Sequence, residues 1–141
     1  MIIYIRKNDQ LISIIIRSQY KTEGIKFFTP DDFSQQLAYM NREKSYVIPP
    51  HIHNKVERKV SLTQEVLYIK SGKVRVDYYD ENKVYFESRI LNAGDVALFS
   101  SGGHGFTMIE ESEIIEVKQG PYSGDQDKSR FKPVSNKEIN L

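Results

Sequence analysis

The fold class is decided by the stretch at residues 73–79, Lys73-Val74-Arg75-Val76-Asp77-Tyr78-Tyr79. Apolar Val74, Val76 and Tyr78 alternate with charged residues, which is the two-residue period of a strand with one buried face. Turn sequences stand on both sides, Ser71-Gly72 before the stretch and Asp80-Glu81-Asn82 after it. The stretch therefore predicts a half-buried strand between two turns.

Further short strands are expected on both sides of this one, because β-branched and aromatic residues gather in short runs between turn residues. The expected strands are residues 2–5, 11–16, 24–28, 45–48, 65–70, 83–91, 96–99, 106–109 and 113–117. Residues 31–40 leave two possibilities open, a short helix or the start of a strand. Many short strands with almost no helical period predict an all-β sandwich or barrel.

Length and composition point to one domain and exclude several functions. The chain has 141 residues, a net charge of +1 and no cysteine. A length of this order predicts a single domain, with a barrel over residues 1–120 and a polar tail over 121–141. Without a basic excess we expect no nucleic-acid partner, and without cysteine there is no disulfide or thiolate site.

No targeting or membrane-spanning segment is expected. The longest apolar run near the start, residues 11–16, is too short for a membrane span or a typical signal sequence. We therefore expect a cytoplasmic protein with no membrane partner.

The motif with the clearest chemistry is Pro49-Pro50-His51-Ile52-His53, which holds two of the three histidines in the chain. Side chains at positions i and i+2 of an extended strand point to the same face. His51 and His53 would then present two imidazoles side by side, and neutral imidazole is the commonest metal ligand in proteins. The pair predicts half of a metal site.

The remaining motif residues resemble the two motifs of the cupin superfamily. Glu65 is followed seven positions later by Gly72, and Gly94-Asp95 leads to a glycine-rich loop that carries His104. The resemblance covers residues 46–117 and implies a double-stranded β-helix, the jelly-roll barrel, in one domain. It also implies one divalent metal ion, whose ligands are His51, His53, Glu65 and His104.

The motif match departs from the superfamily pattern at three positions. Glu57 lies at the usual short distance after the second histidine, but only Glu65 is followed by the expected strand and glycine, so Glu57 is kept as an alternative ligand. Ser100 stands where the second motif has a proline. His104 comes one residue earlier than expected.

Three imidazoles and a carboxylate would leave one or two positions open on the metal, as in catalytic sites. Fe, Mn, Zn and Ni all suit such ligands. Residues 101–106 and 116–122 are similar to small cupins found with sugar-nucleotide and polysaccharide biosynthesis, which implies a sugar or sugar derivative as ligand. Isomerisation or epimerisation of a sugar is expected, with two alternatives, an Fe(II)-dependent dioxygenase and a non-catalytic binding module.

Strand alternation suggests what lines the pocket beside these ligands. The apolar residues that share a face with Glu65 or His104 are Leu67, Ile69, Phe106 and Met108. They form either an apolar pocket wall or ordinary core.

The last expectations concern charged residues near the pocket and an edge strand that could form a dimer interface. Glu116 and Lys118 share a face that points either to solvent or to the pocket mouth, and Arg58 is a candidate phosphate ligand. A homodimer is expected through an edge strand, for which residues 11–16 are the candidate.

Overall fold

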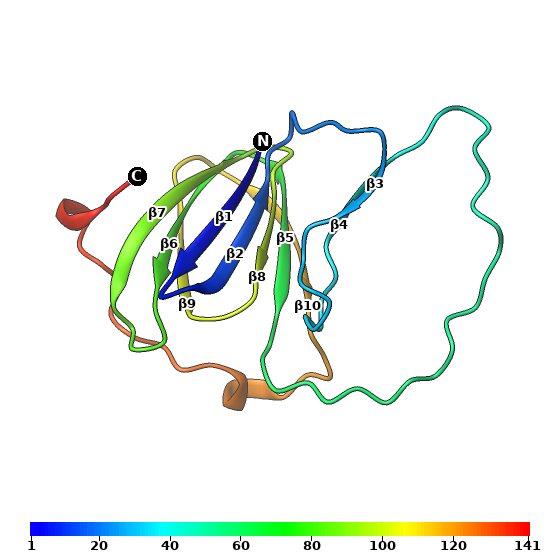
Figure 1. The fold of residues 1–141 in the computed structure, drawn as a ribbon. Coiled ribbons are helices and arrows are strands. Elements are labelled where there is room, and N and C mark those ends of the chain that lie inside the picture. The colour runs from blue at the N-terminus through cyan, green and yellow to red at the C-terminus, as the bar shows by residue number, and fades with distance from the viewer.

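The protein is all-β in the computed structural model, which describes residues 1–141 (Figure 1). Ten strands and two short 3-10 helices make up its regular structure. They are β1 (Ile2–Lys7), β2 (Gln10–Ile16), β3 (Gly24–Phe27), β4 (Ala38–Asn41), β5 (Glu65–Ser71), β6 (Lys73–Tyr79), β7 (Tyr85–Asn92), β8 (Val96–Phe99), β9 (Gly103–Met108), β10 (Glu113–Lys118), η1 (Gly124–Asp127) and η2 (Asn136–Glu138). Neither helix is long or apolar enough to cross a membrane.

The strands form three antiparallel sheets. The largest has five strands in the order β1-β2-β8-β5-β10, the second has the order β7-β6-β9, and β3 and β4 form a separate hairpin. The main core lies between the first two sheets, where Ile12, Ile69 and Val76 belong to one buried cluster. The all-β prediction is thus confirmed, and the open question over residues 31–40 is resolved in favour of a turn followed by β4.

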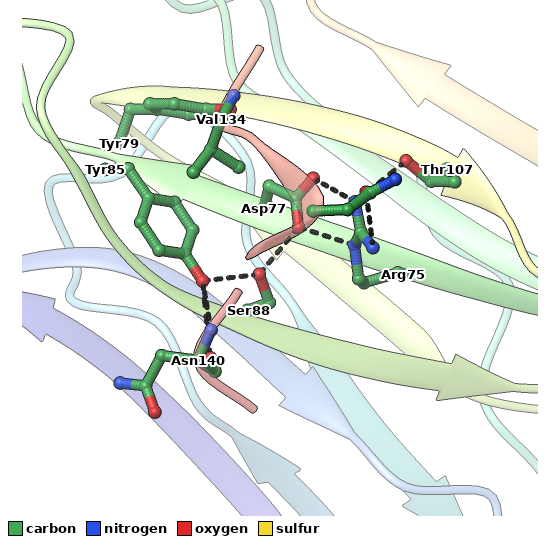
Figure 2. A network of polar contacts seen from close by, with 9 residues as sticks. Arg75, Asp77, Tyr79, Tyr85, Ser88, Thr107, Val134 and Asn140 are labelled. Carbon is green, nitrogen blue, oxygen red and sulfur yellow. Dashed lines mark hydrogen bonds and ion pairs between the residues drawn. The ribbon is translucent and has the colours of Figure 1, made fainter. Parts of the chain in front are cut away.

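The alternation that predicts β6 is confirmed on its inner face, where Val74, Val76 and Tyr78 are fully buried. The outer face differs from the expectation, because Asp77 is also buried. Its carboxylate lies 2.8 Å from Arg75 Nε and accepts a 2.6 Å hydrogen bond from Ser88 Oγ (Figure 2). A buried charge needs such partners to offset its lost hydration.

The last part of the C-terminal tail (residues 121–141), from Val134 to Asn140, lies against this outer face of the three-stranded sheet. Val134 N donates to Tyr79 Oη at 2.9 Å, and Asn140 N donates to Tyr85 Oη at 2.8 Å (Figure 2). The backbone N–H of Ser88 donates to the Asn140 carbonyl at 2.7 Å. The tail therefore follows the sheet closely, and Asp77 lies beneath it.

The isoleucine-rich strand β2 lies between β1 and β8, so the expectation that it forms an edge is wrong. Both of its faces are covered. Ile12 and Ile15 belong to the core between the sheets, while Ile14 and Ile16 belong to a second cluster with Phe28. A continuous apolar run is typical of a strand buried on two faces.

A long arm, residues 42–64, joins β4 to β5 and contains no strand. Figure 1 shows it as an extended loop that swings away from the sheets. The strand expected at residues 45–48 is absent, and so is the extended histidine pair expected beyond it. Pro49 and Pro50 lack the N–H group that a ladder needs, and no neighbouring strand is present to pair with this segment.

Candidate functional site

A carboxylate and an imidazole meet where the two sheets come together. Glu65 is the first residue of β5 in the five-stranded sheet, and His104 belongs to β9 in the three-stranded sheet. Glu65 Oε1 lies 2.6 Å from His104 Nε2. The side chains are 11% and 26% exposed, so the pair is largely shielded and still reachable from solvent.

Local packing holds this pair in place. Glu65 points to the same side as Leu67 and Ile69, as the alternation predicts, and both of these are buried. The His104 ring lies over Phe99, with ring centroids 4.6 Å apart, and beside Phe106 at 5.2 Å. Aromatic contacts on two sides restrict the orientation of the imidazole.

The pair lines a pocket of about 600 Å³, which is a size typical of small-ligand sites. Strands β5, β9 and β10 form part of its wall, and the tail forms the rest. The residues that define its chemistry are Glu65, His104, Phe106, Glu116, Lys118, Lys128, Arg130 and Phe131. Three cationic side chains and two phenylalanine rings thus line the same pocket as the Glu65–His104 contact, together with the carboxylates of Glu116 and Asp127.

Hydrogen bonds and a nearby positive charge in the pocket favour the ionised form of the Glu65 carboxyl group. Burial raises the pKa of its carboxyl, but hydrogen bonds with His104 and Glu116 and the nearby charge of Lys118 outweigh burial and lower the pKa from 4.5 to about 2. The hydrogen bond with Glu65, together with burial, raises the pKa of Glu116. Glu65 is therefore the ionised member of the carboxyl pair, and Glu116 is the one that more readily holds a proton.

The structure brings two of the four predicted metal ligands together, Glu65 and His104, and leaves the other two on the arm. His51 and His53 are exposed on the arm, with ring centroids 5.2 Å apart, and Nδ1 of His51 is engaged with the Pro49 carbonyl at 2.9 Å. No group of three His, Asp or Glu side chains is placed to share a metal ion. The four predicted ligands are thus not assembled in this arrangement, because His51 and His53 lie on the arm while Glu65 and His104 are in contact.

The other predicted site residues fall in three places. Phe106, Glu116 and Lys118 line the pocket, and Glu116 and Lys118 are at the same time exposed to solvent. The side chains of Leu67 and Ile69 belong to the main core. Residues that lie outside the pocket are Met108, which is half exposed on β9, and Arg58 and Glu57, which are exposed on the arm.

Sequence reasoning missed the contribution of the tail. Lys128, Arg130 and Phe131 complete the pocket, and the Phe131 ring packs edge-on against Tyr79 with centroids 4.9 Å apart. The tail has neither a strand period nor a motif, so its sequence carries no signal that would place it there. An isolated phenylalanine in a polar segment is the single indication of a packing contact.

Fold and site together define an all-β protein with a Glu–His pair at the junction of its two main sheets. The chain matches no family model, no curated protein and no solved structure.

Proposed function

We propose that this pocket binds a sugar or sugar derivative and that His104, oriented by Glu65, exchanges a proton with it, as in an isomerase or epimerase. The observation that carries the proposal is the 2.6 Å contact between Glu65 Oε1 and His104 Nε2 inside the pocket. Isomerisation or epimerisation next to a carbonyl requires a proton to leave a carbon atom and another to return.

An imidazole paired with a carboxylate is suited to this task. The hydrogen bond from His104 Nε2–H to Glu65 selects one tautomer and leaves the other ring nitrogen as the proton acceptor. The ionised Glu65 then stabilises the imidazolium that forms when His104 takes the proton. Glu116 supplies a further carboxyl group beside the pair.

The wall of the pocket supports a polar ligand with a negative group. Phe106 and Phe131 offer apolar faces to the ring of a ligand, while Lys118, Lys128 and Arg130 offer positive charge. Ligand pockets combine such apolar walls with a few polar groups that fix orientation. A sugar that carries a phosphate or carboxylate fits this chemistry.

The proposed fold is the jelly-roll of the cupin type. Two antiparallel sheets around one core support it, and so do the two motif glycines, which occupy turns that require them. Gly72 has φ +84° between β5 and β6, and Gly94 has φ +87° between β7 and β8. Positive φ is unfavourable for residues with a Cβ atom.

Metal binding by His51, His53, Glu65 and His104 stays a prediction, and so does Fe(II)-dependent dioxygenation. The arm would have to move to bring the two imidazoles of His51 and His53 to the pocket. Elemental analysis of protein purified without chelator checks this, with the His51→Ala variant alongside. Metal in the parent protein that is lost in the variant would support the metal site.

Deuterium exchange tests the proposed function. The protein is incubated in D2O with a panel of aldose and ketose phosphates, and incorporation of deuterium next to the carbonyl is followed by NMR. We expect incorporation from at least one sugar, loss of incorporation in His104→Gln, and retention in the control Glu138→Gln, whose side chain lies outside the pocket. Ligand binding without any exchange would replace the isomerase with a binding module.

A further inference from the structure

The arm, residues 42–64, exposes an unusual amount of apolar surface. Every side chain from residue 42 to residue 63 is exposed. The large apolar ones are Tyr46, Val47, Ile48, Ile52, Val56, Val60 and Leu62. Exposure of this many large apolar side chains is typical of an interaction site.

The solvent-accessible surface of the whole chain is also larger than expected for its mass. The chain exposes 10137 Å², whereas a compact monomer of 16.4 kDa exposes about 7,500 Å². The chain thus exposes about 2,600 Å² more than a compact monomer. If each of two chains buried half of this excess, the interface would cover about 2,600 Å² in total, which is within the range of obligate homodimers. The excess surface of the chain is thus large enough for a stable dimer.

A matching surface lies on the outer side of β5 and β10. Tyr68 is 41% exposed, Ile115 is 52% exposed and Val117 is 56% exposed. In addition, β10 ends the five-stranded sheet, so its outer edge is open. An open edge strand is a template for pairing with an extended segment of another chain.

The arm joins the barrel beside this edge. Its last residue, Gln64, accepts a 2.9 Å hydrogen bond from the backbone of Gln119, which directly follows β10. Glu65, where the arm meets β5, pairs with Lys118 of β10. A two-fold axis near this point would therefore let each arm reach the β10 edge of the other copy, and two-fold contacts of this reciprocal kind are the commonest in oligomers.

Charge also matches the arm to this edge. Residues 42–64 carry five basic and two acidic side chains, whereas residues 110–118, which comprise β10 and the turn before it, carry four carboxylates and one basic residue, Lys118. Glu110 and Glu113 are paired with Lys73 and Lys70, but Glu111 makes no ion pair within the chain. Opposite charge steers two surfaces together and fixes their register.

We propose that the chain forms a two-fold homodimer in which the arm of each copy lies along the β10 edge of the other. The apolar residues of the arm cover Tyr68, Ile115 and Val117 of the partner copy. This assignment replaces the interface expected at residues 11–16, since β2 is an inner strand. It stands independently of the proposed sugar chemistry.

Light scattering coupled to size-exclusion chromatography tests the proposal on the full chain. At about 100 μM, well above the dissociation constants that interfaces of standard size reach, we expect a mass twice the 16.4 kDa of one chain. Ile48→Asp in the arm and Ile115→Asp in β10 should each raise the dimer dissociation constant at least about tenfold. Val84→Asp is the matched control, because Val84 is 56% exposed and lies in the turn between β6 and β7.

Three results would overturn the proposal. The first is a monomeric mass at that concentration. The second is a dimer that neither Ile48→Asp nor Ile115→Asp weakens, with circular dichroism showing that both variants are folded. The third comes from hydrogen exchange: protection of the arm that does not change on dilution would mean that the arm folds against its own barrel.

Discussion

Arg17 and Asp95 join the end of β2 to the turn that precedes β8. Arg17 Nη1 lies 2.7 Å from Asp95 Oδ2, and the Asp95 side chain is 1% exposed. The same carboxylate accepts hydrogen bonds from the backbone N–H groups of Ser18 at 2.9 Å and Asn92 at 2.8 Å. One buried side chain thus joins two segments of the chain, residues 17–18 after β2 and the turn at residues 92–95 before β8.

Removing this carboxylate should destabilise the protein strongly. Asp95→Ala removes the charged partner of the Arg17 guanidinium, which keeps only the Ile90 carbonyl as acceptor, and leaves two N–H groups without their acceptor. Breaking a buried ion pair costs about 3–5 kcal/mol. Urea denaturation followed by circular dichroism measures the change. The control is Glu110→Ala, which breaks an exposed pair with Lys73 and should cost less than about 1 kcal/mol. Equal losses in the two variants would contradict the role given to Asp95.

Tyr78 should make stability depend on pH in the alkaline range. Burial raises the pKa of its hydroxyl well above the usual 10, and the hydroxyl donates a 3.1 Å hydrogen bond to Ser13 Oγ. The stabilisation by neutral Tyr78 is fully present below the unfolded pKa of 10, and it falls as pH rises above that value because the unfolded tyrosine then ionises.

The matched comparison is Tyr78→Phe, which cannot ionise. Below pH 10 the variant should be less stable by about 1 kcal/mol, the value of one lost hydrogen bond. Above pH 10 this difference should shrink. Denaturation of both proteins at about pH 8 and about pH 10.5 gives the comparison, and a difference that stays constant across the two conditions would argue against a buried, neutral hydroxyl.

Two glycines with similar backbone angles should respond differently to alanine. Gly72 has φ +84°, and a Cβ atom there would overlap the Glu111 carbonyl oxygen, whereas Gly124 has φ +68° with no atom within 4 Å of the added Cβ. Gly124→Ala should cost about 1 kcal/mol from backbone strain alone. Gly72→Ala should cost more, because strain and overlap add. Thermal unfolding of the two variants measures which substitution costs more stability. A smaller loss in Gly72→Ala than in Gly124→Ala would mean that the β5–β6 turn opens freely.

The tail should contribute to stability through its hydrogen bonds to β6 and β7. Deleting residues 134–141 removes the bonds to Tyr79 Oη, Tyr85 Oη and Ser88 N, and at about 1 kcal/mol for each the loss is about 3 kcal/mol. Deleting Leu141 alone, which is 67% exposed, should change little. Urea midpoints of the two truncations provide the measurement, and a stable 1–133 chain would refute the role of the tail.

The sequence predicted most strands because alternation is a local property. Residues 73–79 show it plainly, and the same period placed Glu65, Leu67 and Ile69 on one face. It predicted the wrong place for β2 because an apolar run looks the same at an edge and in the middle of a sheet. Which strands become neighbours is set by contacts between residues far apart in the chain.

Only part of the candidate site was predicted from the sequence. Glu65 was identified through a motif position at the start of an expected strand and His104 through one in an expected glycine-rich loop, and the structure brings them into contact. His51 and His53 depend on where the arm lies, and the arm has no pairing partner within its own chain to define its path. The tail residues of the pocket, Lys128 and Arg130, are held by tertiary contacts that no local pattern encodes.

The burial of β2 on both faces has a consequence for how the chain avoids incorrect pairing. Ile14, Ile15 and Ile16 are chemically identical, so a slip of one residue against β8 would exchange one isoleucine for another and change little hydrophobic free energy. Ser13 breaks this degeneracy. Its hydroxyl donates to the Leu98 carbonyl at 2.7 Å and accepts from Tyr78, and a slipped strand would leave these polar atoms buried and unsatisfied. A single hydroxyl group thus penalises misaligned registers in the isoleucine-rich strand β2.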